Sequence, residues 1–146
     1  MNINKKICVI GSGRWGSNHI RTLSSLGALG GVVDNDEKNI HSVNKLYPET
    51  KTFSNVQDSF LHKYDGYVLA TPASTHYNIA KDIINNNFNV LIEKPMTLNS
   101  NEAQKLVDLS KKKNVSVMVG HLLLFHPAII KIKELIDSGK IGSLQY

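Results

Sequence analysis

The chain has 146 residues, of which 41% are hydrophobic and 20% are charged, and its formal net charge is +5. These values are typical of one globular domain, and no apolar stretch approaches the length of about 18 residues that a transmembrane helix requires. The first residues also lack the apolar run of a secretory signal. We therefore expect a soluble, cytoplasmic protein with no membrane partner.

The positive charge is concentrated in the last third of the sequence. From residue 105 onward there are seven lysines against three acidic residues. Lys111, Lys112 and Lys113 close a predicted helix, where cations suit the negative end of the helix dipole. No aromatic residue alternates with them, so we interpret these lysines as a solvated helix end and expect no nucleic-acid partner.

Short apolar runs alternate with amphipathic stretches, beginning at the N-terminus. The apolar runs predict strands at 6–10, 30–33, 51–53, 67–70, 89–92 and 115–119. The amphipathic stretches predict helices at 14–26, 37–46, 74–86 and 100–113, the last with a serine cap at Ser100. Strands separated by helices cannot pair as hairpins, so the predicted fold is a doubly wound α/β domain with a mostly parallel sheet. The single cysteine, Cys8, lies in the first apolar run and is expected to be buried.

The glycine-rich segment after the first predicted strand matches the pattern G-x-G-x-x-G. Its six residues are Gly11, Ser12, Gly13, Arg14, Trp15 and Gly16. The first glycine permits a tight turn, the second lets a pyrophosphate approach the backbone, and the third lets helix and strand pack closely. Because the segment follows a strand and opens a helix, it predicts a Rossmann fold that binds a dinucleotide at a helix N-terminus.

A carboxylate ends the second predicted strand, about 20 residues beyond the glycines, as this motif requires. This residue, Asp34, would accept hydrogen bonds from the adenine ribose, and Asn35 brings no positive charge for a 2′-phosphate. The cofactor is therefore predicted to be NAD rather than NADP. The alternative role for Asp34 is to cap the helix that follows.

Three larger side chains on the first predicted helix have open roles. Arg14 could contact phosphate or stack on adenine, and Trp15 either faces the cofactor or packs against the sheet. We interpret His19 as a structural histidine with satisfied hydrogen bonds.

Two further segments fall at strand ends, where parallel sheets bind ligands. The run from Ala70 to His76 follows the fourth strand, and Glu93, Lys94 and Pro95 follow the fifth. The proline biases Lys94 toward extended geometry at the tip of the strand. An amine there could exchange a proton with a substrate oxygen. The alternative is a surface lysine paired with Glu93.

Four segments together resemble the glucose-fructose oxidoreductase / inositol dehydrogenase / MocA family over the whole chain. They are Gly-Ser-Gly-Arg-Trp-Gly-Ser-Asn-His (11–19), Ala-Thr-Pro-Ala-Ser-Thr-His (70–76), Glu-Lys-Pro-Met-Thr-Leu-Asn (93–99) and Val-Gly-His-Leu-Leu-Leu-Phe-His-Pro-Ala (119–128). The Glu-Lys-Pro segment is the most specific. The resemblance implies that Lys94 is the catalytic lysine and that the cofactor site also includes Thr71, Pro72, Thr75, His76, Glu93 and His121.

The resemblance also implies a second, mostly antiparallel α+β domain that we expect to be absent here. Residues 1–125 would then form the NAD-binding domain, and 126–146 would form a linking helix (128–136) and the start of a strand (141–146). Exposed apolar residues at this end would favour a homo-oligomer. Many members have Asn and Arg where this chain has Leu122 to Leu124, so relatives that act on nucleotide-linked sugars resemble it most.

Two functions follow from these patterns. The first is the NAD-binding part of an oxidoreductase that acts on a sugar or nucleotide-linked sugar, with Lys94 as its catalytic group. The alternative is a stand-alone NAD(H)-binding module without chemistry. No metal site is expected, because His121 and His126 are five residues apart and match no common ligand spacing.

Overall fold

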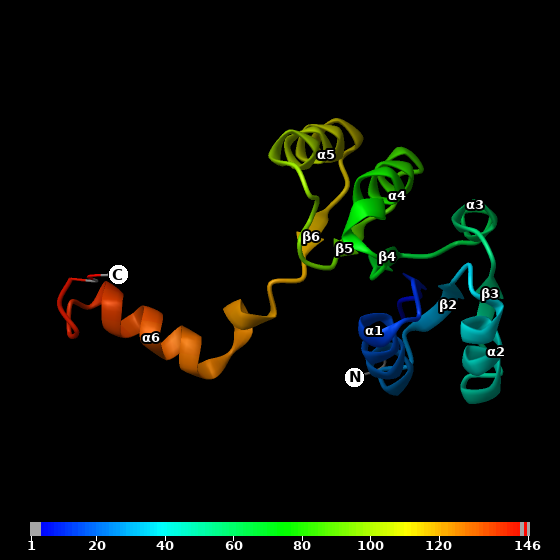
Figure 1. Ribbon diagram of the computed structural model, residues 1–146, viewed down its shortest axis with the longest axis horizontal. Helices are drawn as coiled ribbons and strands as arrows, with labels where there is room; N and C mark the ends of the chain where they lie inside the picture. Colours follow the sequence, from blue (N-terminus) through cyan, green and yellow to red (C-terminus); the bar gives the residue numbers. More distant parts are fainter. Residues whose placement is uncertain (1–3, 144, 146) are drawn as a thin grey trace.

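Six parallel strands form one sheet in the computed structural model, which describes residues 4–143 and 145 (Figure 1). The strands are β1 (Ile7–Ile10), β2 (Leu29–Val33), β3 (Lys51–Phe53), β4 (Gly66–Leu69), β5 (Val90–Ile92) and β6 (Val117–Val119). Their order across the sheet is β3-β2-β1-β4-β5-β6, and every neighbouring pair is parallel. The predicted doubly wound α/β fold is confirmed.

The four predicted helices of the domain are all present. They are α1 (Arg14–Ser25), α2 (Glu37–Leu46), α4 (Ala73–Asn85) and α5 (Ser100–Lys113). Two short elements were not predicted, the helix α3 (Val56–Ser59) and the 3₁₀ helix η1 (Leu122–Phe125). Each has four residues, too few to show a helical period in the sequence.

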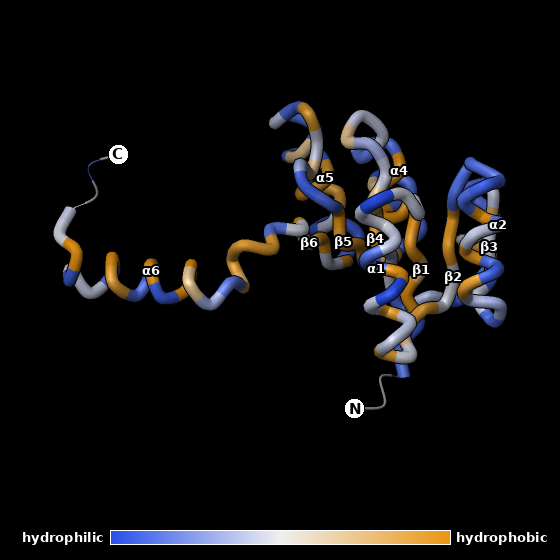
Figure 2. Tube along the Cα trace, turned by 60° about the horizontal axis from the view of Figure 1, so that its bottom comes forward, coloured by the Kyte–Doolittle hydropathy of each residue, from blue (hydrophilic) through white to orange (hydrophobic). Residues whose placement is uncertain are grey.

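Alternate residues of the central strands face opposite sides of the sheet and build two cores. Cys8 and Ile10 of β1 lie in the core under α4 and α5, whereas Val9 packs with Ile20 of α1 and Val43 of α2. Cys8 is fully buried, as predicted, and this burial raises the pKa of its thiol far above the ordinary value. Figure 2 shows the apolar strands beside helices that carry both polar and apolar residues.

The helix caps correct two expectations. Asp36, and not Asp34, caps α2, because its side chain accepts a hydrogen bond from the Lys38 N–H. Asn99 caps α5 by accepting from the Asn101 N–H, and Ser100 is already the first residue inside the helix. Asp34 is therefore not committed to capping the helix that follows it.

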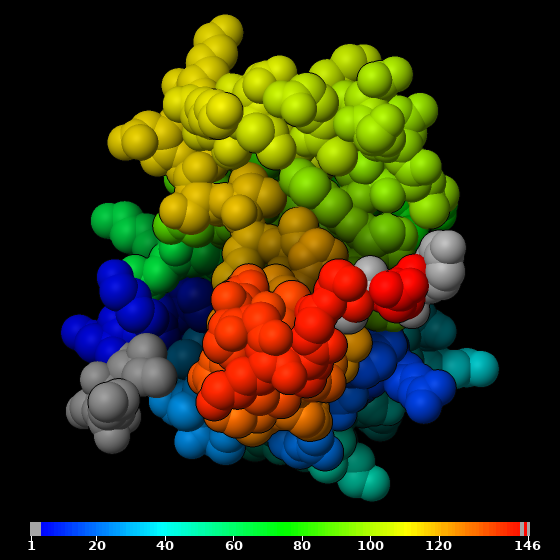
Figure 3. Space-filling view, turned by 90° about the vertical axis from the view of Figure 1, so that its left-hand side faces the viewer, coloured from blue at the N-terminus to red at the C-terminus, as the bar shows by residue number. Residues whose placement is uncertain are grey.

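The last predicted helix, α6 (Pro127–Asp137), projects away from the sheet (Figure 1). Seen from that side, it stands end-on in front of the domain (Figure 3). Ile129, Ile130 and Ile132 are exposed on it. The strand expected from Ile141 is not formed over Ile141 to Ser143, which have no partner strand, and Leu144 and Tyr146 lie outside the described residues. No helix in the described part of the chain is long and apolar enough to cross a membrane.

Candidate functional site

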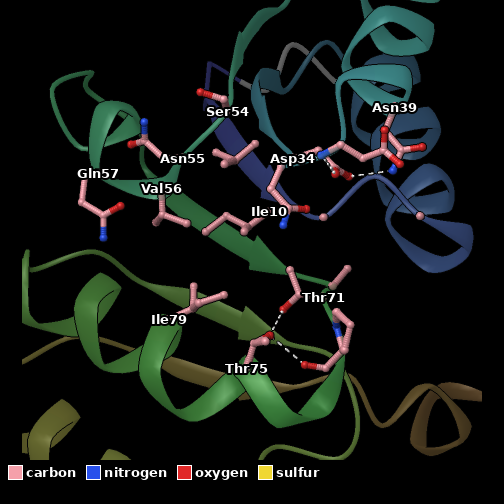
Figure 4. Close-up of a pocket in the computed structure, with 17 residues that line it drawn as sticks. Ile10, Asp34, Asn39, Ser54, Asn55, Val56, Gln57, Thr71, Thr75 and Ile79 are labelled. Atoms are coloured by element: carbon pink, nitrogen blue, oxygen red, sulfur yellow. Dashed lines mark hydrogen bonds between the residues drawn. The ribbon is translucent and has the colours of Figure 1, made fainter.

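The strand order reverses between β1 and β4, and a crevice forms at such a point beyond the carboxyl ends of the strands. A cavity of about 620 Å³ opens there (Figure 4). Its lining comes from the ends of β1, β2, β3 and β4 and from the starts of the following helices. The lining residues are Ile10, Gly11, Gly13, Val33, Asp34, Asn35, Asp36, Asn39, Ser54, Asn55, Val56, Gln57, Ala70, Thr71, Pro72, Thr75 and Ile79.

The glycines of the loop differ in the space around them. Gly11 has φ +88°, and a Cβ there would lie 2.8 Å from the carbonyl oxygen of Ala70. A Cβ on Gly16 would overlap the carbonyl oxygen of Gly11, so α1 and the loop touch backbone to backbone. Around Gly13 a Cβ would meet no atom within 4 Å. This open space beside the N-terminus of α1 fits a pyrophosphate.

Asp34 is tied directly to the glycine loop. Its Oδ2 accepts hydrogen bonds from the Ser12 N–H (2.7 Å), the Ser12 hydroxyl (2.6 Å) and the Asn39 amide (3.2 Å). Its Oδ1 accepts from the Asp36 N–H at 2.9 Å. Burial alone would raise the pKa of Asp34, but these hydrogen bonds together outweigh it and hold the pKa below the usual value. The carboxylate is therefore ionised and oriented, and Oδ1 keeps a lone pair for another donor.

Thr71 and Thr75 close the cavity from the β4 side (Figure 4). The Thr75 hydroxyl donates to the carbonyl oxygen of Pro72 at 2.7 Å. Because that uses its only hydrogen, the Thr71 hydroxyl is the donor in the 2.7 Å contact between the two side chains. The loop after β4 thus has a fixed shape at the cavity wall.

His76 does not line the cavity, contrary to our expectation. It is 1% exposed, and its ring lies behind the loop. Its Nε2 is 2.8 Å from the carbonyl oxygen of Thr71 and its Nδ1 is 2.8 Å from that of Pro95. A neutral imidazole can donate to only one of them, whereas the protonated ring would donate to both. His76 joins the loops that follow β4 and β5.

Sequence reasoning missed one wall of the cavity. Ser54 and Asn55 after β3, with Val56 and Gln57 at the start of α3, face the space opposite Ile79 (Figure 4). The only local signal was an Asn that could cap a helix, and Asn55 does accept from the Asp58 N–H. These residues bring amide groups and an apolar side chain to the cavity wall.

The residues after β5 form a second cluster outside the cavity. The Lys94 ammonium lies 5.9 Å from the centre of the Trp15 ring, and Trp15 is 46% exposed. Glu93 pairs with His19 at 2.8 Å and not with the Lys94 side chain, so the alternative pairing for Lys94 is wrong. The bond between Lys94 and Pro95 is cis. Lys94 is thus held at the strand tip beside the helix that follows the glycine loop.

Three further residues expected at the cofactor site do not line the cavity. Arg14 and His121 are exposed and do not line the cavity, and Ser12 lies beneath the loop against Asp34. His126 caps α6 by accepting from the Ala128 N–H. In the described part of the chain no three His, Cys, Asp or Glu residues gather as a metal site would require.

Known proteins match this chain in sequence and in fold. The model of an oxidoreductase family with an NAD-binding Rossmann fold matches residues 5–121. UDP-N-acetylglucosamine 3-dehydrogenase of Acidithiobacillus ferrooxidans is 31% identical over 133 residues, which are 90% of this chain and 42% of that protein. This chain therefore spans less than half the length of that relative.

Solved structures give the same result. GenD2 from gentamicin A biosynthesis, crystallised with NAD, has a TM-score of 0.89 at 25% identity over 96% of this chain and 41% of its own. The WlbA dehydrogenase from Bordetella pertussis, crystallised with NADH and UDP-GlcNAcA, has a TM-score of 0.88 at 23% identity over 94% of this chain and 43% of its own, and at that identity supports the fold alone. The family match and the cavity at the glycine loop agree, and the chain belongs to the Gfo/Idh/MocA oxidoreductase family through its NAD-binding Rossmann domain.

Proposed function

We propose that this chain is the cofactor-binding part of an oxidoreductase that moves a hydride between NAD(H) and a sugar hydroxyl or keto group. The observation that carries the proposal is the Lys94 amine, held at the tip of β5 beside Trp15. A protein that only stored the cofactor would need the glycine loop and Asp34 but no amine at this end. The 31% identity to UDP-N-acetylglucosamine 3-dehydrogenase also supports an oxidoreductase function.

The residues divide between the parts of the cofactor. The backbone of Gly13 and the N-terminus of α1 would hold the pyrophosphate, because an added Cβ at Gly13 would meet no atom within 4 Å and no side chain caps the first N–H groups of the helix. Gly11 would shape the turn that precedes them. Asp34 would accept the adenine ribose hydroxyls, with Asn35 beside it. Asn55, Gln57 and neighbouring residues would enclose the adenine.

Lys94 would act on the substrate oxygen. NAD(H), held by the glycine loop and Asp34, would supply the hydride acceptor for oxidation of the carbon that carries the hydroxyl, or the hydride donor for reduction of the keto group. During oxidation the neutral Lys94 amine takes the hydroxyl proton as the carbonyl forms, and during reduction the Lys94 ammonium gives a proton to the carbonyl oxygen. His121 and Arg14 are exposed, and we propose that they contact the nicotinamide side and the phosphates, respectively.

We propose a nucleotide-linked sugar as the substrate class. The support is the identity to UDP-N-acetylglucosamine 3-dehydrogenase over most of this chain. Leu122, Leu123 and Leu124 are more than half exposed after β6, so this edge offers apolar surface where a free sugar would need hydrogen bonds. The same surface and α6 would favour self-association, which sedimentation at increasing concentration measures.

The experiment is a substrate panel on the protein that carries this chain at its full length. Nucleotide-linked sugars and free inositol are incubated with NAD⁺, and NADH absorbance is followed. Turnover that is faster with the nucleotide-linked sugars supports the proposal. NAD binding without turnover of any sugar would support the non-catalytic module instead.

A further inference from the structure

Helix α1 reaches the residues after β5 with two side chains that lie one turn apart. Trp15 and His19 are four positions apart and share one face of the helix. Consecutive residues of the strand tip meet them: the Lys94 ammonium lies 5.9 Å from the Trp15 ring centre, and the Glu93 carboxylate lies 2.8 Å from His19 Nε2. The helix that opens at the glycine loop therefore touches the tip at two points.

The Glu93 carboxylate is buried and has neighbours on three sides. Glu93 is 5% exposed, its Oε1 meets His19, and its Oε2 accepts the N–H of Lys94 at 3.2 Å. The third wall is Gly120 after β6, where an added Cβ would lie 3.1 Å from Oε2. Three elements, α1, β5 and the end of β6, thus define where this carboxylate lies.

The direction of the His19 contact follows from the chemistry of its partner. An ionised carboxylate only accepts hydrogen bonds, so His19 Nε2 carries the hydrogen and donates it. Without His19, Oε1 of this buried carboxylate has no donor, which is unfavourable, so we expect the group to move toward water or another donor. If Glu93 moves, the Lys94 N–H loses its acceptor at the same time.

We propose that His19 is a positioning residue for Lys94. Its imidazole holds the Glu93 carboxylate, the carboxylate holds the Lys94 main chain, and the amine is thereby kept over Trp15. This inference rests on the proposed function for the role of Lys94 in turnover, but the positioning itself is a property of the chain without ligand. His19 is then more than the structural histidine that the sequence indicated.

The test uses Trp15, the only tryptophan in the chain, as a reporter of the Lys94 ammonium. The emission change caused by Lys94→Met is measured in the otherwise unchanged chain and in chains with His19→Gln, His19→Leu or Thr22→Leu. Gln keeps an N–H donor near the position of Nε2, and Thr22→Leu adds a leucine to an exposed site on the same helix. In chains with His19→Gln or Thr22→Leu, we expect Lys94→Met to change the emission as much as it does in the otherwise unchanged chain. In the chain with His19→Leu, we expect less than half of that change.

Circular dichroism establishes whether each variant is folded. If His19→Leu does not fold, Gly120→Ala tests the proposal in its place, because the added Cβ would displace the Glu93 carboxylate without changing α1. Gly120→Ala should also reduce the effect of Lys94→Met to less than half. An undiminished Lys94→Met effect in the folded His19→Leu chain, or in Gly120→Ala when that chain must decide, would overturn the proposal.

A separate measurement tests the cofactor site. Energy transfer from Trp15 to added NADH gives the dissociation constant, which should change less than threefold with His19→Leu because the glycine loop and Asp34 are untouched. If no variant bound NADH, the proposed function would fail, while the emission measurements without ligand would still decide the role of His19.

Discussion

The carboxyl ends of β1 to β4 differ from those of β5 and β6 in how far other residues of this chain surround them. At the carboxyl ends of β1, β2, β3 and β4, residues at or after all four strands line a cavity, and Asp34 accepts four hydrogen bonds. At the β5–β6 end, Lys94 lies outside that cavity, and Leu122 to Phe125 are exposed. The difference teaches that, under the proposed function, the adenosine half would be recognised within this domain, whereas the edge that carries Lys94 is exposed in the described residues.

The largest expected effect lies at the open end. Lys94→Met should lower turnover of the full-length protein by at least 100-fold, because general acid–base catalysis contributes about that much or more. NAD binding should change by only a few-fold, since the Lys94 side chain does not line the cavity. Steady-state kinetics and calorimetry on the same preparation check both. If more than about a tenth of the turnover remained, the catalytic role of Lys94 would have to be withdrawn.

At the enclosed end, Asp34→Ala should weaken NAD binding by about 10- to 150-fold. A hydrogen bond to a charged acceptor is worth about 1.5–3 kcal/mol, and the substitution also frees Ser12 and Asn39. Titration calorimetry measures the loss. Asp36→Ala, which removes the cap of α2 but no ribose contact, is the matched control, and equal losses in both variants would contradict the role of Asp34.

Substitutions at two glycines of the G-x-G-x-x-G segment should separate an effect on folding from an effect on cofactor binding. Gly16→Ala should destabilise the domain by about 1–3 kcal/mol or more, because its Cβ would overlap Gly11. Gly13→Ala meets open space and should leave the melting temperature nearly unchanged while weakening NAD binding, since the methyl group occupies the place of the pyrophosphate. Thermal unfolding with and without NAD distinguishes them. Unweakened NAD binding by Gly13→Ala would place the pyrophosphate elsewhere.

The smallest effect concerns pH. The pKa of Asp34 is lowered in the folded chain, so its contribution to the free energy of unfolding is complete above the unfolded-state pKa of about 3.9. That contribution is lost as the pH falls through the lower folded-state value. The stability difference between the native chain and Asp34→Asn should be constant from about pH 5 to 7 and shrink below about pH 4. Urea unfolding across this range tests it, and a difference that grew in acid would have the wrong sign.

The sequence was most informative where the signal is local. The glycine loop, Asp34 and Thr71 follow strands at fixed spacing, so their meeting at one edge follows from a parallel sheet. The strand at 51–53 was predicted, but the wall from Ser54 to Gln57 was missed because α3, with four residues, is too short to show a helical period. The contact between His19 and Glu93 joins residues 74 positions apart and depends on how α1 packs across the sheet. His76 was correctly placed after β4, but its buried position between the Thr71 and Pro95 carbonyl oxygens depends on the fold.

The central claim is that this chain by itself contains a complete NAD site. Calorimetric titration of the 146-residue chain with NADH and with NADPH tests it most directly. The account predicts one NADH bound per chain, at least about tenfold weaker binding of NADPH because Asp34 repels a 2′-phosphate, and loss of the NADH signal with Asp34→Ala. Absence of NADH binding by the folded chain, or equal or tighter binding of NADPH, would contradict it.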